Sequence, residues 1–288
     1  MKALIIGVNG QDGYYLSRLL HQRSFEVIGV SRKDSPIIAD ISNFEKTFYL
    51  VKKYLPDYIF HLAANSTTNH SSLFENHETI STGTLNILES VKQFSPHSKV
   101  FISGSGLQFK NESNPIKETD EFEARDPYSV SRIQSIYAAR YYRSLNIKTY
   151  VGYFFNHESP RRTERHISKK ISEAAKRIAQ GSKEKIEIGD ISVVKEWTYA
   201  EDVVKGILKL LEQDNIYEAN IGSGVGYSIR EWLALCFNLI NKNWAQYIAP
   251  NKSFISDYRK LICDPSRIFS LGWQPEVSIE ELAKMMMA

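Results

Sequence analysis

The chain has 288 residues, 42% of them hydrophobic and 12% aromatic, which is ample for a core and excludes whole-chain disorder. Its 36 Lys and Arg against 33 Asp and Glu give a formal net charge of +3, too small and too dispersed to predict a nucleic-acid partner. Two cysteines are too few for a disulfide framework, and no stretch is typical of a signal peptide or membrane span, so we expect a cytoplasmic protein without a membrane partner.

Short hydrophobic runs alternate with longer amphipathic ones over the first 155 residues. The predicted elements are, in order, strand 2–8, helix 13–24, strand 26–31, helix 44–56, strand 58–64, helix 78–94, strand 99–105, helix 128–146 and strand 148–155. This alternation is typical of an α/β protein with a Rossmann-type, doubly wound parallel sheet.

After residue 155 the pattern changes. Helices continue over 167–181, 200–213 and 228–240, but the strands become shorter and the connections less regular. We therefore expect a dinucleotide-binding domain over 1–155 and mainly a smaller α/β substrate lobe over 156–288. The lobe should be interleaved with the first domain, because some of its segments are expected to return to the sheet.

A glycine-rich segment, GxxGxxG, joins the first predicted strand to the first predicted helix. Glycines permit a tight turn and close backbone approach, and a helix N-terminus offers N–H groups to a pyrophosphate. A purely structural turn is the alternative. The predicted cofactor contacts in this segment are Gly7, Asn9, Gly10, Gln11, Asp12 and Gly13.

The second predicted strand ends in VSRKD. An acidic residue at this point would bind a ribose 2′-hydroxyl, whereas a basic one accommodates a 2′-phosphate. Arg32 and Lys33 precede Asp34, which favours NADP over NAD, although a solvated basic loop would have the same composition. The segments ADIS and HLAA supply further predicted cofactor contacts: Asp40, Ile41, Leu62, Ala63 and Ala64.

Tyr128 and Arg132 stand four residues apart in a predicted helix and so share one face. With GxxGxxG, HLAA and a serine-bearing strand end, this pair resembles the extended short-chain dehydrogenase/reductase superfamily. GVNGQDGYYL, FFNHESPRR and DPSRIFSLGWQPE are more closely similar to the GDP-mannose 4,6-dehydratases and their neighbours, the GDP-4-keto-6-deoxymannose reductases. The resemblance spans residues 3 to about 285. It implies bound NADP, a GDP-sugar pocket in the C-terminal lobe, and a homodimer packed through a four-helix bundle.

In such enzymes hydride passes between the nicotinamide and C4 of the sugar, while a tyrosine carries the O4 proton beside a cation that also binds the cofactor. The resemblance gives these roles to Tyr128 and Arg132, which replaces the usual lysine. Arginine keeps the charge but presents a bulkier fork, so we expect retained cofactor binding and slowed or narrowed catalysis. The alternative is that both are ordinary helix residues.

The fifth predicted strand ends in SGSGLQFK, where the dehydratases read Ser-Thr-Ser-Glu-Leu-Tyr-Gly. Gly104 stands at the threonine position and Gly106 at that of the glutamate that acts at C5 and C6. Ser103 or Ser105 could still contact O4. The missing carboxylate predicts a 4-keto-sugar reductase. A dehydratase whose base lies elsewhere, or a paralogue that binds without turnover, stays open.

The resemblance also implies substrate contacts in the C-terminal lobe. Lys195 takes the place of a diphosphate-binding arginine; a second such arginine would fall at Phe254, with Arg259 as the nearest substitute. The remaining expected contacts are Asn156, Glu158, Arg161, Lys169 and Lys170. The histidines show no metal-ligand spacing, so no metal site is expected.

Overall fold

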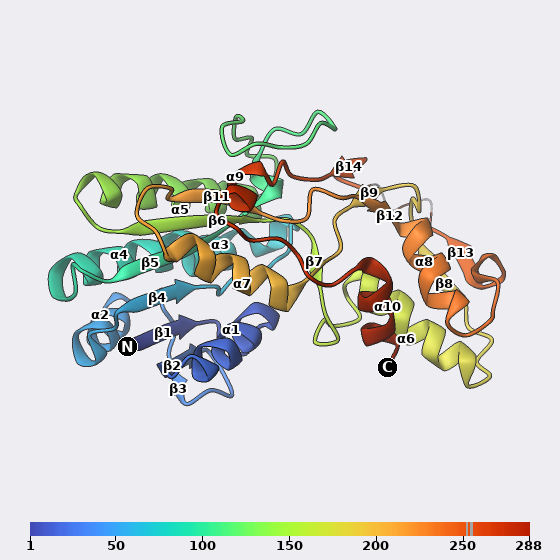
Figure 1. Cartoon of the computed structure of the whole chain (residues 1–288), viewed down its shortest axis with the longest axis horizontal. Coiled ribbons are helices and arrows are strands. Elements are labelled where there is room, and N and C mark those ends of the chain that lie inside the picture. Colours follow the sequence, from blue (N-terminus) through green and yellow to red (C-terminus); the bar gives the residue numbers. More distant parts are fainter. Residues whose placement is uncertain (252, 254–255) are drawn as a thin grey trace.

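The structure is a computed structural model that describes residues 1–251, 253 and 256–288 (Figure 1). Its largest element is a seven-stranded parallel sheet in the order β11-β6-β5-β4-β1-β2-β3. The strands are β1 (Lys2–Ile6), β2 (Glu26–Ser31), β3 (Ile37–Ile38), β4 (Tyr58–His61), β5 (Lys99–Ser105), β6 (Thr149–Phe154) and β11 (Glu218–Ile221). The strand order reverses between β1 and β4, which is where open α/β sheets bind ligands, beyond the carboxyl ends of the strands.

Helices cover both faces of this sheet (Figure 1). One face carries α2 (Phe44–Tyr54), α4 (Gly83–Phe94) and α5 (Pro127–Ser144), and the other carries α1 (Gln11–Gln22) and α7 (Ala200–Leu211). Ala3 and Ile5 of β1 face the α1 side, whereas Leu4 and Ile6 face the α2 side. Burial on both faces explains the continuous hydrophobic run in the sequence. The predicted doubly wound α/β fold is confirmed.

A smaller lobe adjoins the carboxyl ends of the strands (Figure 1). It contains α6 (Ile167–Ala179), α8 (Ile229–Asn238), η4 (Trp244–Tyr247), α10 (Ile279–Met287) and the paired strands β8 (Ile186–Ile188) and β13 (Ile248–Pro250). Leu16 of α1 and Trp232 of α8 belong to one continuous hydrophobic core. Because β11 lies in the large sheet and α7 packs on it, the chain passes between the two parts more than once. A boundary at residue 155 stays a prediction.

Several short elements lie outside the main sheet and its covering helices. They are η1 (His70–Ser72), α3 (Leu73–Asn76), η3 (Gly106–Gln108), α9 (Ser266–Ser270) and two small sheets, one of β7 (His157–Glu158) with β10 (Thr198–Tyr199), the other of β12 (Tyr227–Ser228), β9 (Val194–Lys195) and β14 (Lys260–Leu261). Most expected elements begin and end within two residues of the observed bounds, but two differ further. The helix expected over 78–94 begins as a π-helix, η2 (His77–Thr82), before α4. The strand expected over 58–64 ends at His61, where the chain passes Gly7.

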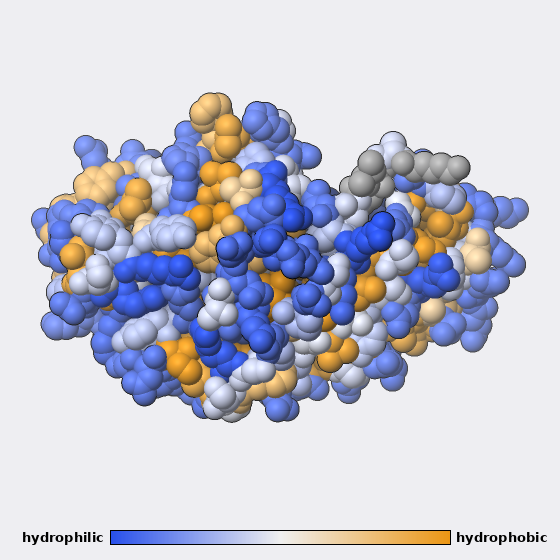
Figure 2. Space-filling model, turned by 90° about the horizontal axis from the view of Figure 1, so that it is seen from above, coloured by the Kyte–Doolittle hydropathy of each residue, from blue (hydrophilic) through white to orange (hydrophobic). Residues whose placement is uncertain are grey.

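The outer surface is of mixed character. On the face seen in Figure 2, hydrophobic residues are interspersed among hydrophilic ones. Within the described ranges, no helix has both the length and the hydrophobicity needed to cross a membrane.

Candidate active site

A cleft of about 420 Å³ opens beyond the carboxyl ends of β1, β4, β5 and β6 and extends onto the smaller lobe. It brings together predicted residues that are far apart in the sequence: Gly7, Asn9, Gly10, Gln11, Asp12, Gly13, Leu62, Ala64, Ser103, Ser105, Tyr128, Arg132, Asn156, Glu158, Arg161 and Lys195. A cavity of about 190 Å³ shares Gly7 and Gly10 with the cleft, and its walls include Arg32, Asp40, Ile41 and Ala63. Because they share lining residues, the two adjoin as one depression, and the smaller cavity forms its narrow end near β2.

The glycine turn between β1 and α1 has the geometry that a dinucleotide needs. Gly7 has a φ of +92°, and a Cβ there would lie 2.8 Å from the backbone N of Ala63. A Cβ on Gly13 would lie 2.2 Å from the carbonyl oxygen of Gly7. The N-cap residue, Gly10, makes no side-chain capping bond, so the first N–H groups of α1 remain available to a phosphate. These residues therefore fit a pyrophosphate.

The end of β2 forms the narrow end of the depression. Ser31 and Arg32 line it, but Lys33 does not. The side-chain amide of Asn9 donates to the carbonyls of Lys33 and Asp34 at 2.6 and 3.0 Å and so fixes the loop. Asn9 is thus a support for this loop as well as a lining residue.

Tyr128 and Arg132 lie on the inner face of α5, which begins with a capping box at Asp126. Both are buried, and the guanidinium carbon of Arg132 lies 5.0 Å from the centre of the Tyr128 ring. Arg132 also donates through Nη1 to the carbonyl and, at 2.8 Å, to the hydroxyl of Ser103. The Tyr128 hydroxyl bonds to none of the described residues. A cation packed on the ring therefore stands beside a phenol that is free to meet a ligand.

The two predicted serines have different surroundings. The Ser103 hydroxyl donates to the carbonyl of His61 at 2.9 Å and accepts from Arg132, so its proton is already used. The Ser105 hydroxyl accepts from the N–H of Leu107 at 3.2 Å and keeps its proton free among the described residues. Ser105 is therefore the better placed of the two to donate to a sugar oxygen.

Aromatic rings from β6 and the residue after it fill the space beside Gly104 and Gly106. A Cβ on Gly104 would lie 2.6 Å from the Tyr153 ring, and one on Gly106 would lie 2.8 Å from the Phe155 ring. A threonine or glutamate would thus displace a ring at either position. The acids that line the cleft, Asp12 and Glu158, are both already paired.

Asp12 links the glycine turn to β7. Its carboxylate lies 2.9 Å from Nε2 of His157. Burial alone would raise the pKa of Asp12, but the charge and hydrogen bond of His157 lower it to about 2. Beside this pair, the Ser159 hydroxyl donates to Gln11 at 2.7 Å. The sequence predicted Asp12 and Gln11 as cofactor contacts but did not indicate that His157 and Ser159, on the opposite wall, bind them.

The lobe side of the cleft is strongly basic. Lys195 is buried, its Nζ lies 4.7 Å from the centre of the Trp197 ring, and it has no hydrogen bond to the described residues. Burial lowers the pKa of Lys195, and the nearby carboxylate of Glu158 only partly offsets this. The other basic lining residues are Arg161, Arg162 and Arg165, and the wall also includes His166, whose pKa is lowered by burial to about 4. The last three were not predicted, although the basic run that follows NHESP was a visible signal.

Some expected substrate contacts lie away from this wall. Lys169 pairs with Glu173 at 2.7 Å, and Lys170 donates to the carbonyl of Glu187. Arg259 is exposed, and its carbonyl accepts from Val194. Neither cavity includes any of the three, so this structure gives them no place at the cleft. Phe254 lies outside the described residues.

Glu158 lines the cleft but is engaged inside the protein. Arg162 donates to its carboxylate at 3.1 Å, and the Ser168 hydroxyl donates to it at 2.5 Å. Its role is therefore to hold Arg162 in place.

Asn156 accepts from the Tyr258 hydroxyl at 3.3 Å. No cluster of three potential metal ligands occurs in the described part of the chain.

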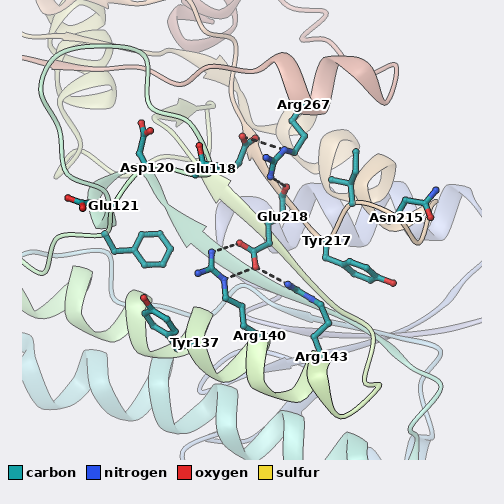
Figure 3. A pocket seen from close by; sticks show the side chains of 13 residues that line it. Glu118, Asp120, Glu121, Tyr137, Arg140, Arg143, Asn215, Tyr217, Glu218 and Arg267 are labelled. Carbon is teal, nitrogen blue, oxygen red and sulfur yellow. Dashed lines mark hydrogen bonds and ion pairs between the residues drawn. The ribbon is translucent and has the colours of Figure 1, made fainter.

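A larger hollow, about 920 Å³, lies elsewhere, between the segment 118–122, α5 and the start of β11 (Figure 3). Arg140 and Arg143 both bind Glu218, and Arg267 approaches Glu118. Its arginines are therefore already paired, and it contains none of the predicted site residues. Size alone does not make it the active site.

A family model described as GDP-mannose 4,6 dehydratase matches residues 4–286 of the chain. The chain belongs to this family. A GDP-mannose 4,6 dehydratase 2 of Arabidopsis thaliana is 28% identical over 320 residues, covering 99% of this chain and 85% of that protein. A GDP-mannose 4,6-dehydratase of Vibrio cholerae is 29% identical over 350 residues, covering 99% and 93%.

Solved structures share the fold of this dehydratase-family chain. RMD from Pseudomonas aeruginosa, complexed with NADPH, has a TM-score of 0.88 at 22% identity and covers 100% of this chain and 98% of its own. The UDP-glucose 4-epimerase of Thermus thermophilus, complexed with NAD, has a TM-score of 0.84 at 20% identity, with the same coverage. The family match confirms the predicted membership of the extended short-chain dehydrogenase/reductase superfamily, and these structures show the same fold.

Proposed function

We propose that the chain is an NADP(H)-dependent oxidoreductase that reduces the 4-keto group of a GDP-linked sugar. The observation that carries this proposal is the unbonded Tyr128 hydroxyl in the cleft, beside a buried cation and with no free carboxylate among the described lining residues. A bound nicotinamide would supply the hydride for C4. The family and the names of its relatives support a nucleotide-sugar substrate.

The cleft residues would then act in cofactor binding, proton transfer and substrate binding. Gly7, Gly10 and the N-terminus of α1 hold the pyrophosphate of the dinucleotide, and Arg32 faces its adenosine end. Tyr128 gives its hydroxyl proton to O4 as the carbonyl becomes an alcohol. Arg132 stabilises the resulting phenolate, and Ser105 donates a hydrogen bond to O4. The basic wall around Lys195 receives the diphosphate of the sugar nucleotide.

A dehydratase is the second candidate, because the curated relatives carry that name. Elimination of water would require a base at C5. The space at Gly106 is closed by Phe155, and Asp12 and Glu158 are held by His157 and Arg162. A dehydratase would therefore have to release one of these pairs when the substrate binds.

One assay separates these functions. The released dinucleotide is identified by mass after the pure protein is denatured. The intact protein is then incubated with GDP-mannose and, separately, with GDP-4-keto-6-deoxymannose plus NADPH. Oxidation of NADPH with the keto sugar alone is the expected result. Conversion of GDP-mannose to the keto sugar would establish the dehydratase instead, and dinucleotide binding with neither reaction would support a non-catalytic paralogue.

Nucleotide-sugar affinity should depend on the charge of Lys195. Burial lowers the pKa of Lys195 below that of an ordinary lysine, which is about 10.4. Lys195 should therefore lose its charge, and the wild type its affinity for GDP-mannose, at a pH at which an ordinary lysine is still charged. A Lys195→Arg variant should lose this dependence, since arginine stays charged. Titration calorimetry across the alkaline range measures both profiles. Identical profiles would mean that Lys195 does not bind the diphosphate.

We also propose a homodimer packed through α4 and α5. Leu85 on α4 and Tyr137 and Tyr141 on α5 are large hydrophobic residues with exposures of 49%, 57% and 61%. A second pair of these helices would complete a four-helix bundle. Tyr141→Glu should convert the dimer to a monomer in sedimentation, whereas Tyr49→Glu, at a similarly exposed tyrosine on α2, should not. A monomeric wild type would refute the proposal.

A further inference from the structure

Arg32, at the narrow end of the depression, is paired with an acidic residue that the β2 sequence does not reveal. Glu75, on α3, reaches Arg32, and its Oε1 lies 2.8 Å from Nη2 of that guanidinium. Its other oxygen accepts from the side-chain amide of Asn65 at 2.7 Å. A carboxylate from a segment 43 residues further along the chain is thereby fixed beside the one cationic side chain that lines this cavity among the described residues.

This arrangement combines two opposite recognition chemistries. A guanidinium suits a ribose 2′-phosphate, whereas a carboxylate accepts from a 2′-hydroxyl and repels a phosphate. Resting on the proposed function, we propose that Glu75 is a specificity-determining residue that limits how strongly the cavity prefers a 2′-phosphorylated dinucleotide. Arg32 attracts the phosphate, and the negative charge of Glu75 beside it weakens that attraction.

Arg32 can serve both partners, because the pair with Glu75 uses only Nη2. Its Nε and Nη1 groups make no hydrogen bond to the described residues, and an arginine has five donors. Side-chain exposures of 53% for Arg32 and 40% for Glu75 leave the pair open to a ligand. The hydrogen bond from Arg32 is the main cause of the lowered pKa of Glu75, and the charge of Arg165 on the cleft wall adds to it. Glu75 is therefore ionised at neutral pH in the unliganded protein.

The test is dinucleotide affinity, which does not require turnover. Dissociation constants for NADPH and NADH are measured by titration calorimetry on the full chain after bound cofactor has been removed. Glu75→Gln keeps the shape of the side chain and removes its charge, so the preference for NADPH over NADH should increase by about tenfold. In an Arg32→Gln background the same change should still increase the preference for NADPH, because the repulsion between the carboxylate and the 2′-phosphate does not require Arg32.

A matched control breaks another exposed arginine–glutamate pair. Arg23 and Glu212 lie 3.4 Å apart with side-chain exposures of 46% and 47%, away from both ligand cavities. Glu212→Gln should leave the preference within about twofold of wild type. If the wild type binds dinucleotide and Glu75→Gln leaves the preference unchanged or lowers it, the inference is wrong while the proposed function stands. If the wild type binds neither dinucleotide, both the proposed function and the inference are wrong.

Discussion

A Tyr128→Phe variant should lose turnover by about 10²–10⁴-fold while its affinity for the dinucleotide stays close to that of the wild type. Phenylalanine keeps the ring on which Arg132 packs, with the guanidinium carbon 5.0 Å from the ring centre, so local packing should survive. Only the hydroxyl is removed, and it bonds to no described residue. The loss should therefore appear in kcat.

The measurement is steady-state oxidation of NADPH with the keto sugar, together with calorimetric dinucleotide affinity and thermal unfolding. Tyr49→Phe removes a phenol from an exposed position on α2 and serves as the control, with unchanged turnover expected. A Tyr128→Phe protein that keeps more than about a tenth of wild-type kcat would remove Tyr128 as proton donor. A loss confined to KM would instead assign Tyr128 to substrate binding.

The fold and the dinucleotide turn were predictable because their signals are local. The run from Lys2 to Ile6 is hydrophobic because β1 is buried on both faces, and Gly7 and Gly13 are required by backbone contacts within a few residues or one strand away. The helical spacing of Tyr128 and Arg132 likewise put both on one face. For Gly13 and for the pair of Tyr128 and Arg132 the sequence neighbours determine the geometry, whereas Gly7 also meets Ala63 after β4.

Contacts between distant segments were not predictable in this way. Nothing near Arg32 in the sequence indicates Glu75, and nothing near Asp12 indicates His157. Similarly, the expectation for Lys169 depended on which side of α6 meets the cleft, and that side is set by packing against α8 and α10. These pairings arise from tertiary structure, so local sequence patterns carry no signal for them.

Two glycines of the turn between β1 and α1 should differ in how strongly their replacement by alanine lowers stability and dinucleotide binding. Gly13→Ala should lower the free energy of unfolding by about 3 kcal/mol and abolish dinucleotide binding. Its Cβ would lie 2.2 Å from the carbonyl oxygen of Gly7 and 2.7 Å from Cα of Val8, which are backbone atoms that cannot move aside without displacing α1 from the turn. Urea denaturation and calorimetry measure the two effects.

Gly10→Ala is the matched comparison, since it adds the same methyl group three residues earlier. Gly10 has a φ of −66°, and its Cβ would approach the same oxygen only to 3.2 Å. We expect a loss of less than about 1 kcal/mol, with weakened but measurable binding. Equal stability and affinity for the two variants would contradict the close packing of α1 on the turn, and with it the pyrophosphate site. The predicted ranking therefore tests the cofactor site through backbone contacts alone, without depending on which sugar the cleft accepts.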